Sequence, residues 1–199
     1  MGFGILLLGY MLSFSLYPGY TDFIAYTVIF YALIKLSDYN RAFRAAKLLS
    51  FTVAVFGMAG LMLTAGEFIG FVDESNAYID LYDHASEALK AVFHVPLLLG
   101  IYKISRDTDL PKYSSTAVWC IVLDILYAII YVLTFAEARL LPYRMFMRGM
   151  LMIIVAVLIF NCFRMICNEG DEKTPWYTIR SKKKKDAAEK TDTDGEDNA

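Results

Sequence analysis

Two short stretches decide how this chain folds: residues 84–94 read HASEALKAVFH, and residues 114–124 read SSTAVWCIVLD. The first leads into a run of apolar residues and the second lies inside one. Both place ionisable side chains in segments that are otherwise hydrocarbon. Charged groups are costly inside lipid, so we expect these segments to be helices that turn their charges toward the interior of a bundle.

The composition supports the same interpretation. The chain has 199 residues, of which 57% are hydrophobic and 20% are charged, with a mean hydropathy of +0.45. Soluble domains average about 25% charged residues and about 45–50% apolar ones. The apolar residues fall in blocks close to the length of about 20 residues that a helix needs to cross a bilayer core. The predicted fold class is therefore an all-α, polytopic integral membrane protein.

Six apolar blocks predict six transmembrane helices. They are residues 2–17, 20–36, 45–66, 84–104, 113–136 and 145–167. The first two are short, and Pro18-Gly19 between them predicts a tight helical hairpin. In the third span, Ser50, Ala54 and Gly57 recur at helical spacing, which is typical of a face that packs closely on another helix.

Local signals refine these spans. Thr21 or Asp22 is expected to cap the second span, and Ser114 or Ser115 the fifth. Pro96 lies inside the fourth span and predicts a kink, because proline removes one backbone hydrogen bond of a helix.

The distribution of Lys and Arg orients the predicted spans. With six crossings both termini lie on one side, and 15 of the 19 Lys and Arg residues then fall on that side. Because positively charged loops are retained in the cytoplasm, we expect both termini there and the acidic connection, residues 67–83, outside. Residues 1–168 are the predicted membrane domain. Residues 169–199 are predicted to be a disordered, charged cytoplasmic tail.

The tail carries a basic cluster beside two aromatic residues, Trp176 and Tyr177. The cations of this cluster are Arg180, Lys182, Lys183, Lys184 and Lys185. Each cation close to an anionic leaflet contributes about 1 kcal/mol of attraction, and Trp and Tyr suit the membrane interface. We therefore expect the tail to bind anionic lipid headgroups rather than nucleic acid.

Asp124 is the sharpest candidate for a functional residue. It lies ten residues beyond Ser114, about 15 Å into the fifth span. An ionised carboxylate at that depth costs at least about 2.5–3.5 kcal/mol on insertion scales. Tyr127 and Tyr131 follow on the same helix face, at spacings of three and four. Asp124 would either bind a proton or cation there, or make a hydrogen bond that fixes the helix register.

Glu87, Lys90 and His94 form a matching stripe on the fourth span, again at spacings of three and four. His94 is deep enough to reach the level of Asp124, and we expect the two to be partners. Glu87 and Lys90 are expected to form an ion pair at the outer mouth, of little energetic weight. The alternative is that His94 is a buried histidine with satisfied hydrogen bonds.

No motif supports an enzyme, a cofactor or a metal centre. The chain has no G-x-S-x-G, P-loop or G-x-G-x-x-G pattern. His84 and Glu87 could share an ion, but His94 lies about 10 Å further along the helix, well beyond the length of a zinc–ligand bond. The three cysteines lie in apolar blocks and are expected to be reduced packing residues. We therefore predict no catalytic residue, no cofactor and no metal site.

In size, number of spans and orientation, the predicted architecture resembles small six-span bacterial membrane proteins, including the substrate-binding subunits of energy-coupling vitamin transporters. The leading hypothesis is a multi-pass protein of the cell membrane that binds or transports a small solute or ion between the fourth and fifth spans. The residues of that site are Asp124, His94, Tyr127, Tyr131 and Glu87. The rival hypothesis is a non-catalytic subunit or scaffold with a membrane protein partner, in which the polar residues only hold helices together.

Overall fold

The computed structural model describes residues 2–13, 20–70, 77–134 and 137–167. These residues form six α-helices and one short 3₁₀ helix: α1 (Gly2–Leu12), α2 (Tyr20–Leu36), α3 (Arg41–Ile69), α4 (Ala77–Asp107), α5 (Pro111–Leu133), η1 (Ala138–Leu140) and α6 (Leu141–Cys167). The predicted all-helical class is confirmed. The basic tail cluster at residues 180–185 lies outside the described residues.

Four of the described helices are long and apolar enough to cross a membrane. The stretches that meet this requirement are Arg41–Gly66, Leu81–Asp107, Pro111–Leu133 and Leu141–Met165. By contrast, α1 has 11 residues and α2 has 17, which is less than the about 20 residues of a full crossing. Four such helices indicate a membrane location.

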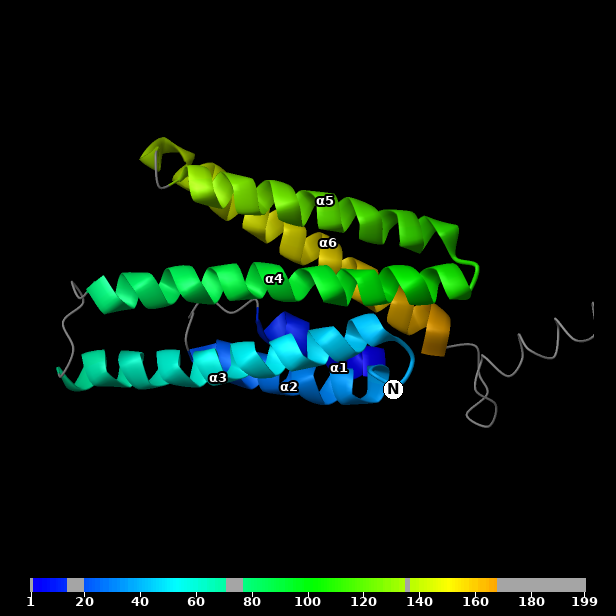
Figure 1. Ribbon diagram of the computed structural model, residues 1–199, viewed down its shortest axis with the longest axis horizontal. Coiled ribbons are helices and arrows are strands. Elements are labelled where there is room, and N and C mark those ends of the chain that lie inside the picture. The colour runs from blue at the N-terminus through cyan, green and yellow to red at the C-terminus, as the bar shows by residue number, and fades with distance from the viewer. Residues whose placement is uncertain (1, 14–19, 71–76, 135–136, 168–199) are drawn as a thin grey trace, which may run out of the picture. The chain divides into compact units, whose positions relative to one another are not determined.

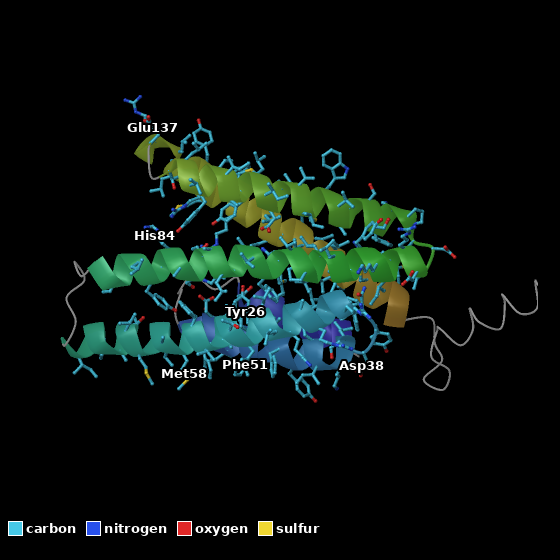
Figure 2. All side chains as sticks on the ribbon, in the orientation of Figure 1. Tyr26, Asp38, Phe51, Met58, His84 and Glu137 are labelled. Atoms are coloured by element: carbon cyan, nitrogen blue, oxygen red, sulfur yellow. The ribbon has the colours of Figure 1, made fainter. Side chains whose placement is uncertain are left out.

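The outward faces of the long helices support that location. Trp119 and Ile125 on α5 and Phe160 on α6 are exposed. Phe51 and Met58 project outward from α3 (Figure 2) and are also exposed. Large apolar side chains on the outside and charges on the inside suit a protein whose surroundings are hydrocarbon.

Helix α4 lies between α3 and α5 (Figure 1) and packs against both. On one side of it, α1 packs on α2 and α2 packs on α3. Helix α6 reaches the others through long side chains. Arg148 of α6 pairs with Glu87 of α4, and the ring of Phe163 lies against Gly4 of α1. Side chains of α4 thus contact helices on both sides of it.

Helix α4 buries different kinds of side chain along its length. Past His94 the buried side chains are mainly apolar, and Leu97, Leu98 and Ile101 are fully buried. The ring of Phe43 lies so close to Gly100 that a Cβ atom there would be 2.6 Å from it. The helix continues through Pro96, a residue that cannot donate a hydrogen bond to the preceding turn. The N-terminal half holds the polar residues considered below.

The small residues of α3 form the packing face that the sequence predicts. Ser50 and Ala54 are buried. A Cβ atom on Gly57 would lie 2.7 Å from the backbone nitrogen of Phe23 in α2. Glycine at this position therefore lets the two helix backbones approach closely.

Both capping predictions are wrong. Helix α5 begins at Pro111, so Ser114 lies inside the first turn, where its hydroxyl donates to the Pro111 carbonyl. Proline suits the first helical position because it has no N–H to satisfy and its φ angle is already helical. Helix α2 begins at Tyr20, so Thr21 and Asp22 lie within the helix and not before it.

The predicted acidic connection is also shorter than expected. Helix α3 continues to Ile69, and α4 begins at Ala77 rather than at His84. Residues 71–76 of this connection lie outside the described part of the chain. An apolar run in the sequence marks the part of a helix that lies in the hydrocarbon. The helix itself can extend further, because its backbone hydrogen bonds are internal.

Candidate functional site

The polar residues of α4 point into the bundle and bind side chains of other helices. Glu87, Lys90 and His94 lie on one face because their spacings of three and four match the helical repeat. Lys90 and His94 are each only 8% exposed. Their partners come from α1, α2, α5 and α6, so five helices, α4 included, contribute to one polar interior.

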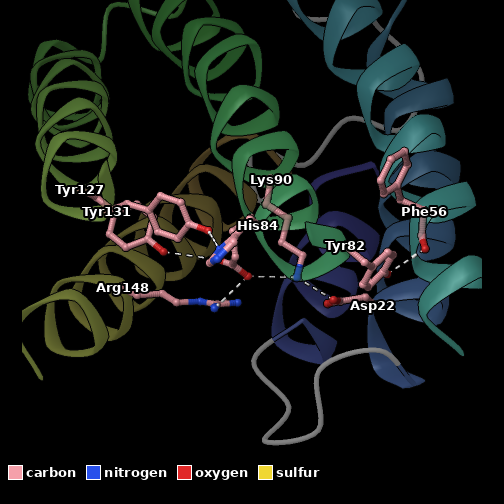
Figure 3. A network of polar contacts seen from close by, with 9 residues as sticks. Asp22, Phe56, Tyr82, His84, Lys90, Tyr127, Tyr131 and Arg148 are labelled. Atoms are coloured by element: carbon pink, nitrogen blue, oxygen red, sulfur yellow. Dashed lines mark hydrogen bonds and ion pairs between the residues drawn. The ribbon is translucent and has the colours of Figure 1, made fainter. Parts of the chain in front are cut away.

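The first group of contacts is an ion-pair cluster made by Asp22, Glu87, Lys90 and Arg148. Figure 3 labels Asp22, Lys90 and Arg148 of this cluster. The Lys90 Nζ lies 2.6 Å from Asp22 Oδ2 and 3.3 Å from Glu87 Oε1. Arg148 Nη1 lies 2.9 Å from the same Glu87 oxygen. The hydroxyl of Tyr127 donates to the other oxygen, Oε2, at 3.2 Å. Glu87 is therefore held by two cations and a phenol, from three helices.

The second group is a His–Asp cluster made by Tyr10, His94 and Asp124. His94 Nδ1 lies 3.2 Å from Asp124 Oδ1, and His94 Nε2 lies 3.2 Å from the Tyr10 hydroxyl. Asp124 is 3% exposed. His94 is the central residue of the membrane-length stretch Leu81–Asp107. The structure thus brings together the two residues that the sequence pairs, at mid-helix.

A third group lies closer to the start of α4. His84 Nδ1 lies 2.6 Å from the Tyr131 hydroxyl (Figure 3), and the Arg144 guanidinium lies 5.1 Å above the Tyr131 ring. The rings of Tyr131 and Tyr127 are 6.3 Å apart. Tyr131 therefore adjoins the ion-pair cluster through Tyr127 and binds His84 directly.

A small, partly open cavity joins the first two clusters. Its lining residues are Tyr26, Glu87, Lys90, Ala91, His94, Tyr127, Arg148, Leu151 and Met152. The space open to the centre of a water-sized sphere is about 20 Å³. About 10–15 Å³ in this measure holds one water molecule, so the cavity has room for about one. Of the five predicted binding residues, His94, Tyr127 and Glu87 line it.

The ion pair of Glu87 and Lys90 differs from the expectation of a weak interfacial contact. Lys90 is buried and also binds Asp22 on α2, while Glu87 also binds Arg148 on α6. A buried charge that loses its partner costs several kcal/mol. The pair is therefore part of a coupled cluster that ties three helices together.

Sequence reasoning misses three members of the site. Asp22 is assigned as a cap because it stands near the start of a span, although its burial at 6% exposure shows an interior role. Neither Arg148 nor Tyr10 is singled out as a site residue. A charged residue within a turn or two of a span's end is the signal that would have found Asp22 and Arg148.

Among the described residues, no group of three or more His, Cys, Asp or Glu side chains could hold a metal ion. His84 and His94 bind different partners, Tyr131 and Asp124. Cys120 and Cys162 are buried and free.

Comparison of the chain with protein-family models, with curated proteins and with solved structures finds no match.

Proposed function

We propose that this chain is a multi-pass protein of the cell membrane that binds or transports a small solute or ion at a polar site between α4 and α5. The site residues are Asp124, His94, Tyr127, Tyr131 and Glu87. The observation that carries the proposal is the contact between Asp124 and His94 at mid-helix, beside a cavity lined by further charged side chains. Ionisable residues inside a membrane are rare, and they mark ion or substrate pathways, proton relays and ligand counter-ions.

The energetics of burial support this proposal. Replacing a buried ion pair with apolar residues of similar volume is often neutral or stabilising. Helices in lipid can associate through close packing of small residues, and α2 and α3 approach closely at Gly57. A bundle that only needed to hold together would therefore not require Asp22, Glu87 and Asp124 in its interior.

The size of the cavity favours an ion over an organic solute. Pockets for organic ligands have volumes of about 300–1,000 Å³, whereas this cavity measures about 20 Å³. A water molecule or a proton carried by one fits without rearrangement of the helices.

We also propose six membrane crossings with both termini in the cytoplasm. Lys90 and Arg148 belong to the ion-pair cluster, so two of the four cations assigned to the outer side bind carboxylates of the bundle. The outer flank is then left with Arg139 and Arg144, which sharpens the charge asymmetry that supports this orientation. The short helices α1 and α2 would cross where the bilayer is locally thinned.

The alternative is a membrane subunit or scaffold with a protein partner. The observation that favours it is that the same polar contacts join α1, α2, α5 and α6 to α4. In that case the site would hold helices in register and bind no ligand.

Thermal unfolding of the purified protein in detergent separates the two functions. Wild type and Asp124→Asn would be compared across a panel of ions, metabolites and pH values, with Asp38→Asn, an exposed carboxylate outside the site, as the matched control. We expect a ligand- or pH-dependent shift in the melting temperature of wild type and of Asp38→Asn, and its loss in Asp124→Asn. The absence of any shift in wild type, together with a large loss of stability in Asp124→Asn, would establish the scaffold instead.

A further inference from the structure

The interior charges do not balance. Three carboxylates, Asp22, Glu87 and Asp124, face two permanent cations, Lys90 and Arg148. With His94 neutral and every carboxylate ionised, this interior carries a net charge of −1. An uncompensated charge in a low-dielectric interior costs several kcal/mol, so the site favours one additional positive charge.

We infer that the exchangeable ligand of this site is a proton, which His94 carries beside the ionised Asp124. The inference rests on the proposed function and names its ligand. One proton on this pair brings the sum of the interior charges to zero. It also sits where the two side chains already lie 3.2 Å apart.

A metal cation fits the same site poorly. The ammonium of Lys90 and the guanidinium of Arg148 already occupy oxygens of Asp22 and Glu87, at 2.6 and 2.9 Å. Both cations also line the cavity, where they would repel another positive ion. Hard cations need about six oxygen ligands, and the part of the chain that the structure describes has no group of even three suitable side chains.

Tyr10 lets the pair gain or lose its proton without a broken hydrogen bond. Its hydroxyl lies 3.2 Å from His94 Nε2. A hydroxyl can donate to a neutral imidazole nitrogen or accept from a charged one by rotating its hydrogen. Both protonation states of His94 are therefore hydrogen-bonded on each side of the ring.

Every helix packed around the pair contributes to the field that it experiences. The titratable and charged groups are Tyr10 on α1, Asp22 and Tyr26 on α2, Glu87 and Lys90 on α4, Cys120, Asp124 and Tyr127 on α5, and Arg148 on α6. On α3, the described titratable residues Arg41, Arg44 and Lys47 lie in its first two turns. The permanent charges in this set are Asp22, Glu87, Asp124, Lys90 and Arg148, which sum to −1.

The cavity supplies a route between the pair and the start of α4. His94 and Glu87 both line it, and Tyr127 is hydrogen-bonded to Glu87. A water molecule in this space would lie beside the His94 ring and the ion-pair cluster. Glu87 itself has no proton to give, because Lys90 and Arg148 hold it as a carboxylate.

Nitrogen-15 NMR of the histidine-labelled protein in detergent tests the inference at neutral pH. The chain has two histidines, and His84→Gln assigns the His94 signal. We expect an imidazolium spectrum for His94 in wild type and in the control Asp38→Asn. In Asp124→Asn we expect a neutral imidazole, because that substitution removes the negative charge that the proton balances.

A neutral His94 in wild type would overturn the inference. This measurement does not depend on the folding of any variant. An imidazolium that persists in Asp124→Asn would also overturn it. Titration of wild type with sodium, potassium, magnesium or calcium ions is the remaining arm, and conversion of His94 to the neutral form would identify a competing metal cation. The other outcome is that a cation or solute shifts the melting temperature of wild type but not of Asp124→Asn, with His94 neutral. That result would support the proposed function and exclude the proton as its ligand.

Discussion

At the scale of single residues, Lys90 is the cation that contacts two carboxylates. Its ammonium lies between Asp22 and Glu87 and is buried. Substitution Lys90→Met preserves much of the volume but leaves Asp22 without a cation. We expect the free energy of unfolding to fall by about 3–5 kcal/mol, as for other buried pairs that lose one partner. Reversible unfolding in mixed micelles measures the change.

A double-mutant cycle supplies the control for this substitution. Asp22→Asn combined with Lys90→Met removes the unpaired carboxylate, so we expect the double variant to be more stable than Lys90→Met alone. Strictly additive losses would show that the two side chains are not coupled, contrary to their 2.6 Å contact.

Residue pairing was only partly predictable from the sequence. The partnership of His94 with Asp124 follows from depth, because two polar residues at mid-span have few other groups to bind. The partnership of Lys90 with Asp22 joins residues 68 positions apart. Helical spacing describes one helix face at a time, so it cannot say which faces of different helices meet.

At the scale of elements, the packing of α2 on α3 depends on Gly57. A Cβ atom there would lie 2.7 Å from a backbone nitrogen of α2, which cannot move aside as a side chain can. We expect Gly57→Ala to lower the free energy of unfolding by about 1–3 kcal/mol, because it forces the helices apart. Thermal unfolding in detergent measures this difference.

Gly149 in α6 offers a matched control. A Cβ atom at this position would have no neighbour within 4 Å. Alanine is the better helix former by about 1 kcal/mol, so Gly149→Ala should be neutral or stabilising. Equal effects of the two substitutions would contradict a close contact at Gly57.

The existence of the long helices was predictable, whereas their ends were not. Apolar blocks identify α3, α4, α5 and α6, because the hydrocarbon of a bilayer demands them. Helices α3 and α4 extend past their apolar blocks through polar residues, which hydropathy does not register. Capping residues also mislead where a proline already sets the first turn, as at Pro111.

At the scale of the whole molecule, the proposed six crossings assign each connection to one side of the membrane. Residues 38 and 109 lie after α2 and α4, and residue 137 lies after α5. In a background without cysteine, we expect Asp38→Cys and Asp109→Cys to be protected from a membrane-impermeant maleimide in intact cells. Glu137→Cys should react.

Labelling after permeabilisation provides the control, since all three cysteines should then react. Reaction of Asp38→Cys but not of Asp109→Cys in intact cells would show that α3 and α4 together do not return the chain to its starting side. Protection of Glu137→Cys would show the opposite orientation.

The class of the molecule, an all-helical protein with membrane-length apolar helices, was its most predictable property, because composition alone indicates it. The polar interior was foreseeable in kind, since intramembrane charges need partners. Its membership was not, because the interior is assembled from α1, α2, α4, α5 and α6. Arg148 of α6, for example, belongs to the site only because it pairs with Glu87 of α4.

The distance along the chain between Asp22 and its partner also has a consequence for biosynthesis. Ribosomes add roughly 5–20 residues each second, and Lys90 follows Asp22 by 68 residues. A nascent chain therefore holds this carboxylate without its ammonium for several seconds after α2 is made, and Glu87 waits about as long for Arg148. A truncated polypeptide that ends after α3 would leave Asp22 permanently without Lys90. Such a fragment should be recognised by membrane quality control and degraded, which makes the arrival of α4 the step that commits the chain to its bundle.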